Sequence, residues 1–226
     1  MLEPSNCAPR PARVFSENER QALYDVILHR RDVRNEFLPT PVEPDVLNRI
    51  LAAAHAAPSV GLSQPWRFVL IRQDETRSAV KKAFERANEE AVALFPQAKQ
   101  SNYTALKLEG IEKAPLNICV VCDRSEPSKP VLGKTHNPDM DLYSTVCAVQ
   151  NLWLAARSEG VGVGWVSIFH DADIRKILKL PESAVIVAYL CVGYVDHLFE
   201  RPELAARGWA SEKQMEAVIM HETWQD

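Results

Sequence analysis

Apolar residues along the chain follow two patterns, one with helical spacing and one nearly continuous over short runs. The helical spacing, read with its start and stop signals, predicts helices over residues 16–31, 45–56, 74–94, 97–113, 141–158 and 171–180. The short apolar runs predict strands over residues 66–72, 116–122, 161–168 and 185–195. Ser16 and Glu19 have the spacing of a capping box and mark the start of the first helix.

The predicted strands are few, short and almost wholly apolar, which indicates a sheet buried between helical layers in one α/β-type domain. The pattern leaves the order and direction of the strands open. Residues 1–15, rich in proline and polar residues, are expected to form an extended arm, followed by a single domain over residues 16–226. The tail from residue 196 onward carries large aromatic residues at Phe199, Trp209 and Trp224. These aromatics can pack either on a partner subunit or on the chain's own core.

Composition and charge narrow the classes of function. Apolar residues make up 46% and charged residues 25% of the 226 residues, which is typical of folded globular proteins and excludes a disordered chain. The formal net charge of −4 argues against a dedicated binder of nucleic acid or of anionic membranes. No apolar run approaches the length of about 20 residues needed to span a bilayer. The first residues lack the apolar core of a signal peptide, and the five cysteines are scattered, so we expect a reduced, cytoplasmic protein.

Three short motifs have ordinary explanations. Cys119 and Cys122 lie three residues apart on a predicted strand, so their thiols face opposite sides of the sheet and we expect no metal site. The glycine run from Gly160 to Gly164 ends a helix and begins a strand, the reverse of a dinucleotide-binding loop, and Gly160 is expected at the helix C′ position. Ser167 lies outside a G-x-S-x-G motif, which argues against a serine hydrolase.

Two further segments are candidates for ligand binding. Arg30, Arg31 and Arg34 place three guanidinium groups at a helix end, where they can converge on one phosphate. Cations at a helix C-terminus are also common without any ligand. Residues 58–66, Pro-Ser-Val-Gly-Leu-Ser-Gln-Pro-Trp, form a turn-rich loop whose backbone groups can contact the edge of a planar ligand. An ordinary helix–strand connection explains this loop equally well.

The two segments together are more specific than either one alone. R-R-x-x-R near the start of the chain and P-S-x-x-x-x-Q-P-W before the first strand resemble the flavin-binding signature of the nitroreductase-like family. Four later segments, over residues 106–115, 133–138, 140–144 and 162–170, resemble the flavin-consuming branch of that family, the 5,6-dimethylbenzimidazole synthases. Asp32 and Leu62 depart from the general nitroreductase pattern of serine and asparagine, as members of that branch do. The resemblance extends over about residues 16–209.

The resemblance implies an α+β, nitroreductase-like fold with a central mixed sheet between helical layers. It implies an intertwined homodimer with reduced FMN at the subunit interface and the C-terminal tail packed on the partner. The implied reaction uses dioxygen to fragment FMNH2 into 5,6-dimethylbenzimidazole, the lower ligand of vitamin B12, and erythrose 4-phosphate. FMN is then a substrate, supplied in reduced form by a separate flavin reductase. No nucleic acid or membrane partner is implied.

The resemblance also assigns roles to individual residues. The phosphate and ribityl chain would be held by Arg30, Arg31, Val33, Arg34, Pro58, Ser59, Gly61 and Arg207. Near the isoalloxazine ring the resemblance places Gly164, Trp165 and Ser167, the last as a catalytic hydroxyl. Lys107 would close over the site. Asp32 is the expected catalytic base for a proton on the ribityl side, and its cationic neighbours are expected to keep it ionised.

Two rival functions remain open from the sequence. An NAD(P)H-dependent nitroreductase or dehalogenase of the same superfamily would leave FMN intact. A non-catalytic flavin-binding protein would bind FMN without any chemistry. Asp32 argues against the second rival, because a carboxylate beside a phosphate opposes binding and a mere binding protein gains nothing from it.

Overall fold

The computed structural model describes residues 11–126 and 130–224 of the chain. The first ten residues of the predicted N-terminal arm lie outside the described residues. The helices are α1 (Glu17–His29), α2 (Pro44–His55), α3 (Asp74–Val92), α4 (Gln97–Ala105), α5 (Met140–Ser158), α6 (Asp171–Leu178) and α7 (Glu203–Ala206), with short 3-10 turns η1 (Val60–Leu62) and η2 (Met215–Val218). The strands are β1 (Trp66–Ile71), β2 (Leu116–Asp123), β3 (Val161–Val166) and β4 (Ala184–Tyr194).

The four strands form one sheet in the order β1-β2-β4-β3, and every neighbouring pair is antiparallel. The prediction of a mixed sheet is wrong: among the described residues the one parallel pairing is an isolated bridge between Asp32 and Val163, on the outer edge of β3. This bridge brings the segment after α1 to the edge of the sheet.

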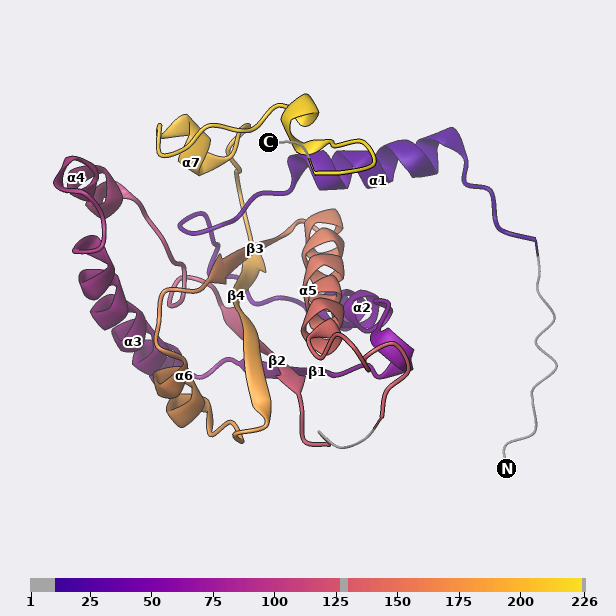
Figure 1. Cartoon of the computed structure of the whole chain (residues 1–226). Coiled ribbons are helices and arrows are strands. Elements are labelled where there is room, and N and C mark those ends of the chain that lie inside the picture. Colours follow the sequence, from indigo (N-terminus) through magenta and orange to yellow (C-terminus); the bar gives the residue numbers. More distant parts are fainter. Residues whose placement is uncertain (1–10, 127–129, 225–226) are drawn as a thin grey trace.

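Helices cover both faces of the sheet, as the strand pattern predicts (Figure 1). On one face α3 and α6 pack through Phe84 and Ile174. On the other face α2 and α5 pack through Ile50 and Leu152. Residues of β2 alternate between these two cores, so the buried Cys119 points away from α5 while Cys122 contacts it through Thr145. The prediction that the two thiols face opposite sides is confirmed.

Four predicted helices are shorter in the structure: those over residues 74–94 and 171–180 each end two residues early, and the first and fourth helices differ for reasons of their own. The first begins at its capping box as expected, but it ends at His29, and Arg30 is already extended. The helix predicted over residues 97–113 stops at Ala105. The chain that follows runs against the segment after α1, where a Cβ on Gly110 would lie only 2.5 Å from the carbonyl oxygen of Arg34. This close backbone contact replaces the last turns of the predicted helix.

The apolar stripe of α1 is not covered by the residues that the structure describes. None of its residues is buried, and Leu23, Tyr24 and Leu28 are 54%, 57% and 65% exposed. The helix reaches past the end of α5 and away from the body of the protein (Figure 1). In the part of the chain that is described, no helix is long and apolar enough to cross a membrane.

Candidate functional site

The segment after α1 packs directly on β3. The Val33 N–H donates to the carbonyl oxygen of Val163 at 3.0 Å, and the Trp165 N–H donates to Oδ1 of Asp32 at 2.9 Å. A Cβ on Gly164 would lie 1.9 Å from the carbonyl oxygen of Val33, so only glycine permits this approach. The glycine run thus holds Asp32 against the strand, a role that the sequence did not reveal. Its first member, Gly160, has φ of +74° just after α5, as predicted for a C′ residue.

Asp32 is fixed by two donors. Besides the Trp165 N–H, Nη2 of Arg34 donates to Oδ2 at 2.9 Å. Burial raises the pKa of the Asp32 carboxyl above its usual value, and the opposing effects of Arg34, the Trp165 N–H and Arg30 do not cancel that increase. From the sequence only the neighbouring charges are visible, and they do favour the ionised form; burial acts against them. A carboxylate with a raised pKa is a stronger proton acceptor.

The three arginines of the segment have different surroundings. The side chain of Arg34 is 12% exposed, and its Nη1 is buried without a hydrogen-bond partner in the described structure. The guanidinium of Arg30 lies 4.9 Å from the ring centroid of Trp153, a cation–π geometry. Arg31 donates instead to the carbonyls of the chain itself, at Leu28, Arg30, Phe199 and Glu200. Arg30 therefore has donors available for an anion, Nη1 of Arg34 has only an ion pair with Glu203 at 3.5 Å, and Arg31 ties α1 to the tail.

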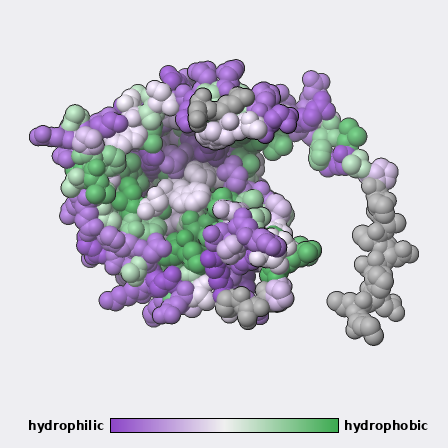
Figure 2. All heavy atoms as spheres, in the orientation of Figure 1, coloured by the Kyte–Doolittle hydropathy of each residue, from purple (hydrophilic) through white to green (hydrophobic). Residues whose placement is uncertain are grey.

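A cavity of about 460 Å³ opens beside these arginines, within the range of roughly 300–1,000 Å³ that is common for small-molecule sites. Its lining is Ile27, Leu28, Arg30, Arg31, Asp32, Arg34, Phe199, Pro202, Glu203, Leu204 and Glu212. The face of the molecule shown in Figure 2 is hollowed below α1 and α7, with apolar surface inside the hollow and hydrophilic residues along its rim. Cations, one carboxylate with a raised pKa and apolar side chains thus meet around one space.

The tail contributes a residue that the sequence analysis missed. Glu203 is almost completely buried, accepts from Nε of Arg207 at 2.5 Å, and lies 3.5 Å from Nη1 of Arg34. Arg207, expected to bind phosphate, is therefore paired with Glu203 and does not line the cavity. The i,i+4 spacing of Glu203 and Arg207 is visible in the sequence, but nothing there indicates that the pair folds onto Arg34. Farther on, Trp209 packs 5.2 Å from Phe95 of its own chain.

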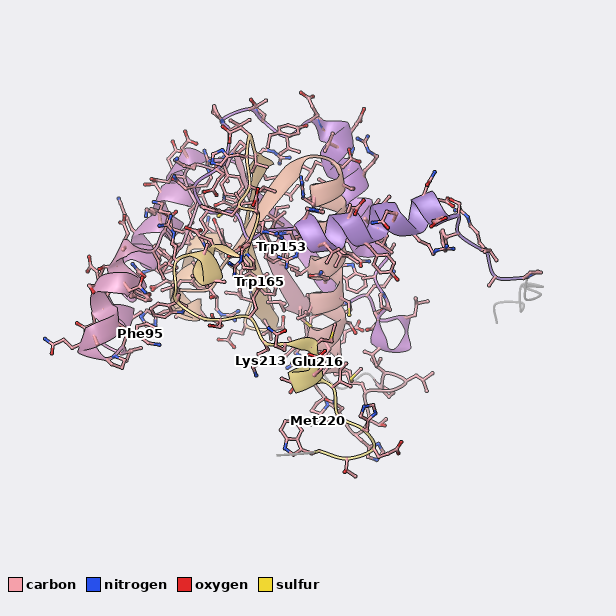
Figure 3. All side chains as sticks on the ribbon, turned by 90° about the horizontal axis from the view of Figure 1, so that it is seen from above. Phe95, Trp153, Trp165, Lys213, Glu216 and Met220 are labelled. Carbon is pink, nitrogen blue, oxygen red and sulfur yellow. The ribbon has the colours of Figure 1, made fainter. Side chains whose placement is uncertain are left out.

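Ser167 follows the last residue of β3 and is exposed. The Trp165 ring lies 6.2 Å from that of Trp153 (Figure 3). The structure therefore places Ser167 just beyond the end of the strand against which Asp32 is held.

Lys107 lies in the segment that borders Arg34, and its Nζ is 3.1 Å from Oε1 of Glu109. Glu109 is buried and also accepts from Lys81 at 3.0 Å and from the Ile111 N–H at 2.7 Å. These donors outweigh burial and keep the pKa of Glu109 below its usual value. A carboxylate that stays charged and well bonded holds this segment in place beside the cavity.

The second sequence motif forms a strained turn. Oγ of Ser59 accepts from the Gln64 N–H, and the Val60 N–H donates to Oγ of Ser144, both at 3.1 Å. Gly61 and Leu62 both have positive φ, at 52° and 53°, which is uncommon for leucine. A Cβ on Gly61 would lie 2.8 Å from the carbonyl oxygen of Leu132, so the turn is pressed against another loop.

One chain does not bring the two motifs together. The Pro58–Gly61 turn contacts Ser144 near the start of α5. Trp153, on whose ring Arg30 stacks, lies toward the end of the same helix. Nine residues of helix separate these contacts by about 14 Å along the axis. The predicted convergence of Pro58, Ser59 and Gly61 with the arginines therefore does not occur within a single subunit.

The loop that supports Gly61 is held by a buried carboxylate. Oδ1 of Asp141 accepts from Nη2 of Arg124 at 2.6 Å, and Oδ2 accepts from Nζ of Lys134. These donors lower the pKa of Asp141 to about 2 against the cost of burial. The sequence analysis included Asp141 in a family segment but gave it no role.

Because this pKa is depressed on folding, the network stabilises the protein above the ordinary aspartate pKa near 3.8 and loses that contribution as pH falls through about 2. We expect Asp141→Asn to lower the free energy of unfolding at pH 7 by about 2 kcal/mol. The difference from wild type should shrink between pH 4 and pH 2 in urea titrations. Asp139→Asn, which removes a half-exposed partner of the same Arg124, should change stability little. An equal loss at every pH would contradict this account.

Comparison with known proteins gives a consistent result. The model of the Nitroreductase family matches residues 27–194, well over half of the chain. The 5,6-dimethylbenzimidazole synthase of Rhodospirillum rubrum is 40% identical over 204 residues, covering 90% of this chain and 96% of that protein. The protein of the same name from Rhodobacter capsulatus is 35% identical over 195 residues, covering 86% and 94%.

A solved structure shares the fold. Oxidized iodotyrosine deiodinase bound to FMN and 3-iodo-L-tyrosine superimposes with a TM-score of 0.70 at 20% identity, covering 89% of this chain and all of that one. At this identity the likeness shows the fold alone. The expected nitroreductase-like α+β fold is thereby confirmed.

Proposed function

Because this chain belongs to the nitroreductase family and has relatives of the named activity at 40% and 35% identity, we propose that it is a 5,6-dimethylbenzimidazole synthase. The proposed reaction is the dioxygen-dependent fragmentation of reduced FMN to 5,6-dimethylbenzimidazole and erythrose 4-phosphate. The observation that carries the proposal is Asp32, a partly buried carboxylate with a raised pKa that lines a cavity between cationic side chains. An acid there opposes the binding of a phosphate, so its presence argues for chemistry.

The cavity residues fit a flavin phosphate. Nη1 of Arg34 makes no hydrogen bond in the described structure and has only the ion pair with Glu203 at 3.5 Å, while Arg30 makes no ion pair among the described residues and stacks on Trp153. These two guanidinium groups would hold the phosphate, while Arg31 keeps the tail in position. Bound FMNH2 would supply both the electrons for dioxygen and the atoms of the product.

Asp32 would accept a proton from the ribityl side of the substrate. Its two oxygens are each oriented by one donor, Trp165 N–H and Arg34 Nη2, so the carboxylate needs little rearrangement to act as a base. Ser167, just beyond the end of β3, would present a hydroxyl that can donate or accept beside the ring. Lys107 and Trp165 would help to exclude water from the site.

A second copy of the chain would complete the site. We place residues 16–226 in one FMN-binding domain. In the homodimer, the Pro58–Gly61 turn of the partner subunit would reach this cavity, which the subunit's own turn does not reach. The exposed apolar stripe of α1 supports this homodimer, since an apolar face of this size usually marks an interface. The tail around η2 also leaves the body of the protein, where Met220 lies far from the sheet (Figure 3).

We therefore expect Leu23→Glu combined with Leu28→Glu to yield monomers in analytical ultracentrifugation and to weaken FMN binding. Both changes place a charge in the apolar stripe of α1 without removing a buried side chain. The matched control is Leu94→Glu, at an 83% exposed leucine that follows α3. The control should remain dimeric. A dimer that persists in the double variant would show that α1 lies outside the interface.

A separate flavin reductase would supply the substrate. Once FMN has been fragmented it cannot be reduced again in place, so each turnover requires a fresh molecule of FMNH2. Delivery by diffusion satisfies this requirement.

The test is to mix the protein, in excess, with chemically reduced FMN in air and to follow the absorbance of oxidised flavin. We expect the flavin to return only in part, because the remainder is consumed. Full recovery of FMN, with oxidation of NAD(P)H when it is added, would point to a nitroreductase. Full recovery without such oxidation would point to a flavin-binding protein.

A further inference from the structure

Glu203 is a buried carboxylate that none of the proposed catalytic steps uses. Its side chain is only 7% exposed, yet it lines the same cavity as Asp32. Burying a carboxylate is costly unless it is paired, and Glu203 has a guanidinium on each side. Oε1 accepts from Nε of Arg207 at 2.5 Å, and Oε2 lies 3.5 Å from Nη1 of Arg34.

Arg34 stands between two carboxylates. Its Nη2 is hydrogen-bonded to Asp32 at 2.9 Å, whereas its Nη1 faces Glu203 without forming a hydrogen bond. Charges thus alternate along a row of four side chains, Asp32, Arg34, Glu203 and Arg207. A guanidinium that neutralises two carboxylates stabilises each of them less than it would stabilise one. Glu203 therefore weakens the stabilisation of the Asp32 carboxylate by Arg34, although the two carboxylates are not in contact.

Several other charged groups also face the cavity that Glu203 lines. The charged groups around Glu203 are Arg30, Arg31, Asp32 and Arg34 from the segment after α1, and Arg207 and Glu212 from the tail. Arg31 is occupied by backbone carbonyls, and Arg207 lies outside the cavity. Inside the cavity Glu203 is thus the acidic group placed to offset Arg34 from the side opposite Asp32.

We propose that Glu203 is a positioning residue that holds Arg34 between two carboxylates, so that Arg34 is not committed to Asp32 alone, at the cost of weaker binding of the phosphate. This inference rests on the proposed function of Asp32 as a base. A carboxylate that served only to anchor α7 would strengthen the site, and its loss would weaken FMN binding. A carboxylate that balances Arg34 predicts the opposite, because its loss frees positive charge for the phosphate.

The main test uses full-length Glu203→Gln, which removes the charge and keeps the shape. Quenching of flavin fluorescence should show oxidised FMN bound several-fold more tightly than by wild type. At saturating reduced FMN, product should form several-fold more slowly, and the acidic limb of the pH–rate profile should move to lower pH because Arg34 then pairs with Asp32 alone. Glu203→Asp should restore both properties in part.

Arg207→Gln provides the matched comparison, since it removes the other partner of Glu203. Glu203 then draws Arg34 away from Asp32, and the acidic limb should move to higher pH. If circular dichroism shows that Glu203→Gln does not fold, Arg207→Gln alone tests the proposal. An acidic limb that stays in place in Arg207→Gln would then overturn the proposal.

Weaker FMN binding by a folded Glu203→Gln, with an unshifted pH profile, would overturn the proposal and leave an anchoring role. The synthase reaction itself is tested by a different result, obtained with the wild-type protein. If wild type binds FMN but releases it intact, the proposed synthase reaction fails. FMN affinity then still decides the role of Glu203, because tighter binding by Glu203→Gln supports the charge balance and unchanged or weaker binding contradicts it.

Discussion

Asp32→Asn is expected to abolish formation of 5,6-dimethylbenzimidazole while the protein still binds FMN. The amide oxygen can continue to accept the Trp165 N–H bond, so the segment after α1 should keep its place on β3. The amide cannot accept a proton, and loss of a general base typically costs roughly 100- to 10,000-fold in rate. Binding should hold or tighten, because the change removes a negative charge beside Arg30 and Arg34.

The control for this variant is Asp173→Asn. Asp173 is also 31% exposed and also paired with an arginine, Arg86, but it lies on α6, away from the cavity. The control should form product at the wild-type rate. Product from Asp32→Asn at the wild-type rate would remove Asp32 from the mechanism. Loss of FMN binding in Asp32→Asn would instead assign Asp32 to ordering the arginines.

Gly164→Ala is expected to destroy the site through the backbone. The added methyl group would lie 1.9 Å from the carbonyl oxygen of Val33, so the segment that carries Asp32 and Arg34 must move off β3. Overpacking of this kind usually costs about 1–3 kcal/mol of stability. We therefore expect a lower midpoint in thermal unfolding, together with loss of measurable FMN binding.

Gly160→Ala separates this effect from a general intolerance of glycine substitution. Its φ of +74° makes alanine strained by about 1–2 kcal/mol, but no atom lies within 4 Å of the new methyl group. This control should be less stable and yet bind FMN normally. If Gly164→Ala also bound FMN normally, the contact between β3 and Val33 would not be needed for the site.

Local signals predicted most of the elements. Ser16 and Glu19 located the start of α1, and the short apolar runs located all four strands of the described structure. The alternation of side chains along β2 placed Cys119 and Cys122 on opposite faces. Each of these features depends on residues close together in the sequence.

Features set by long-range contacts were not predictable in the same way. The helix predicted over residues 97–113 ends at Ala105, and Gly110 packs instead on Arg34, far away in the sequence. The raised pKa of Asp32 required its burial to be known. Nothing in the sequence distinguishes Glu203 from the other charged residues of the tail, because its role depends on the packing of α7 against Arg34. The two binding motifs looked like one site, although α5 keeps them apart within a chain.

The proposed reaction consumes FMN. The decisive experiment is to react reduced FMN with air in the presence of the protein, separate the small molecules by chromatography and identify them by mass spectrometry. We expect a peak with the mass of 5,6-dimethylbenzimidazole, equal in amount to the FMN that is lost. Quantitative recovery of FMN with no such peak would overturn the proposed reaction.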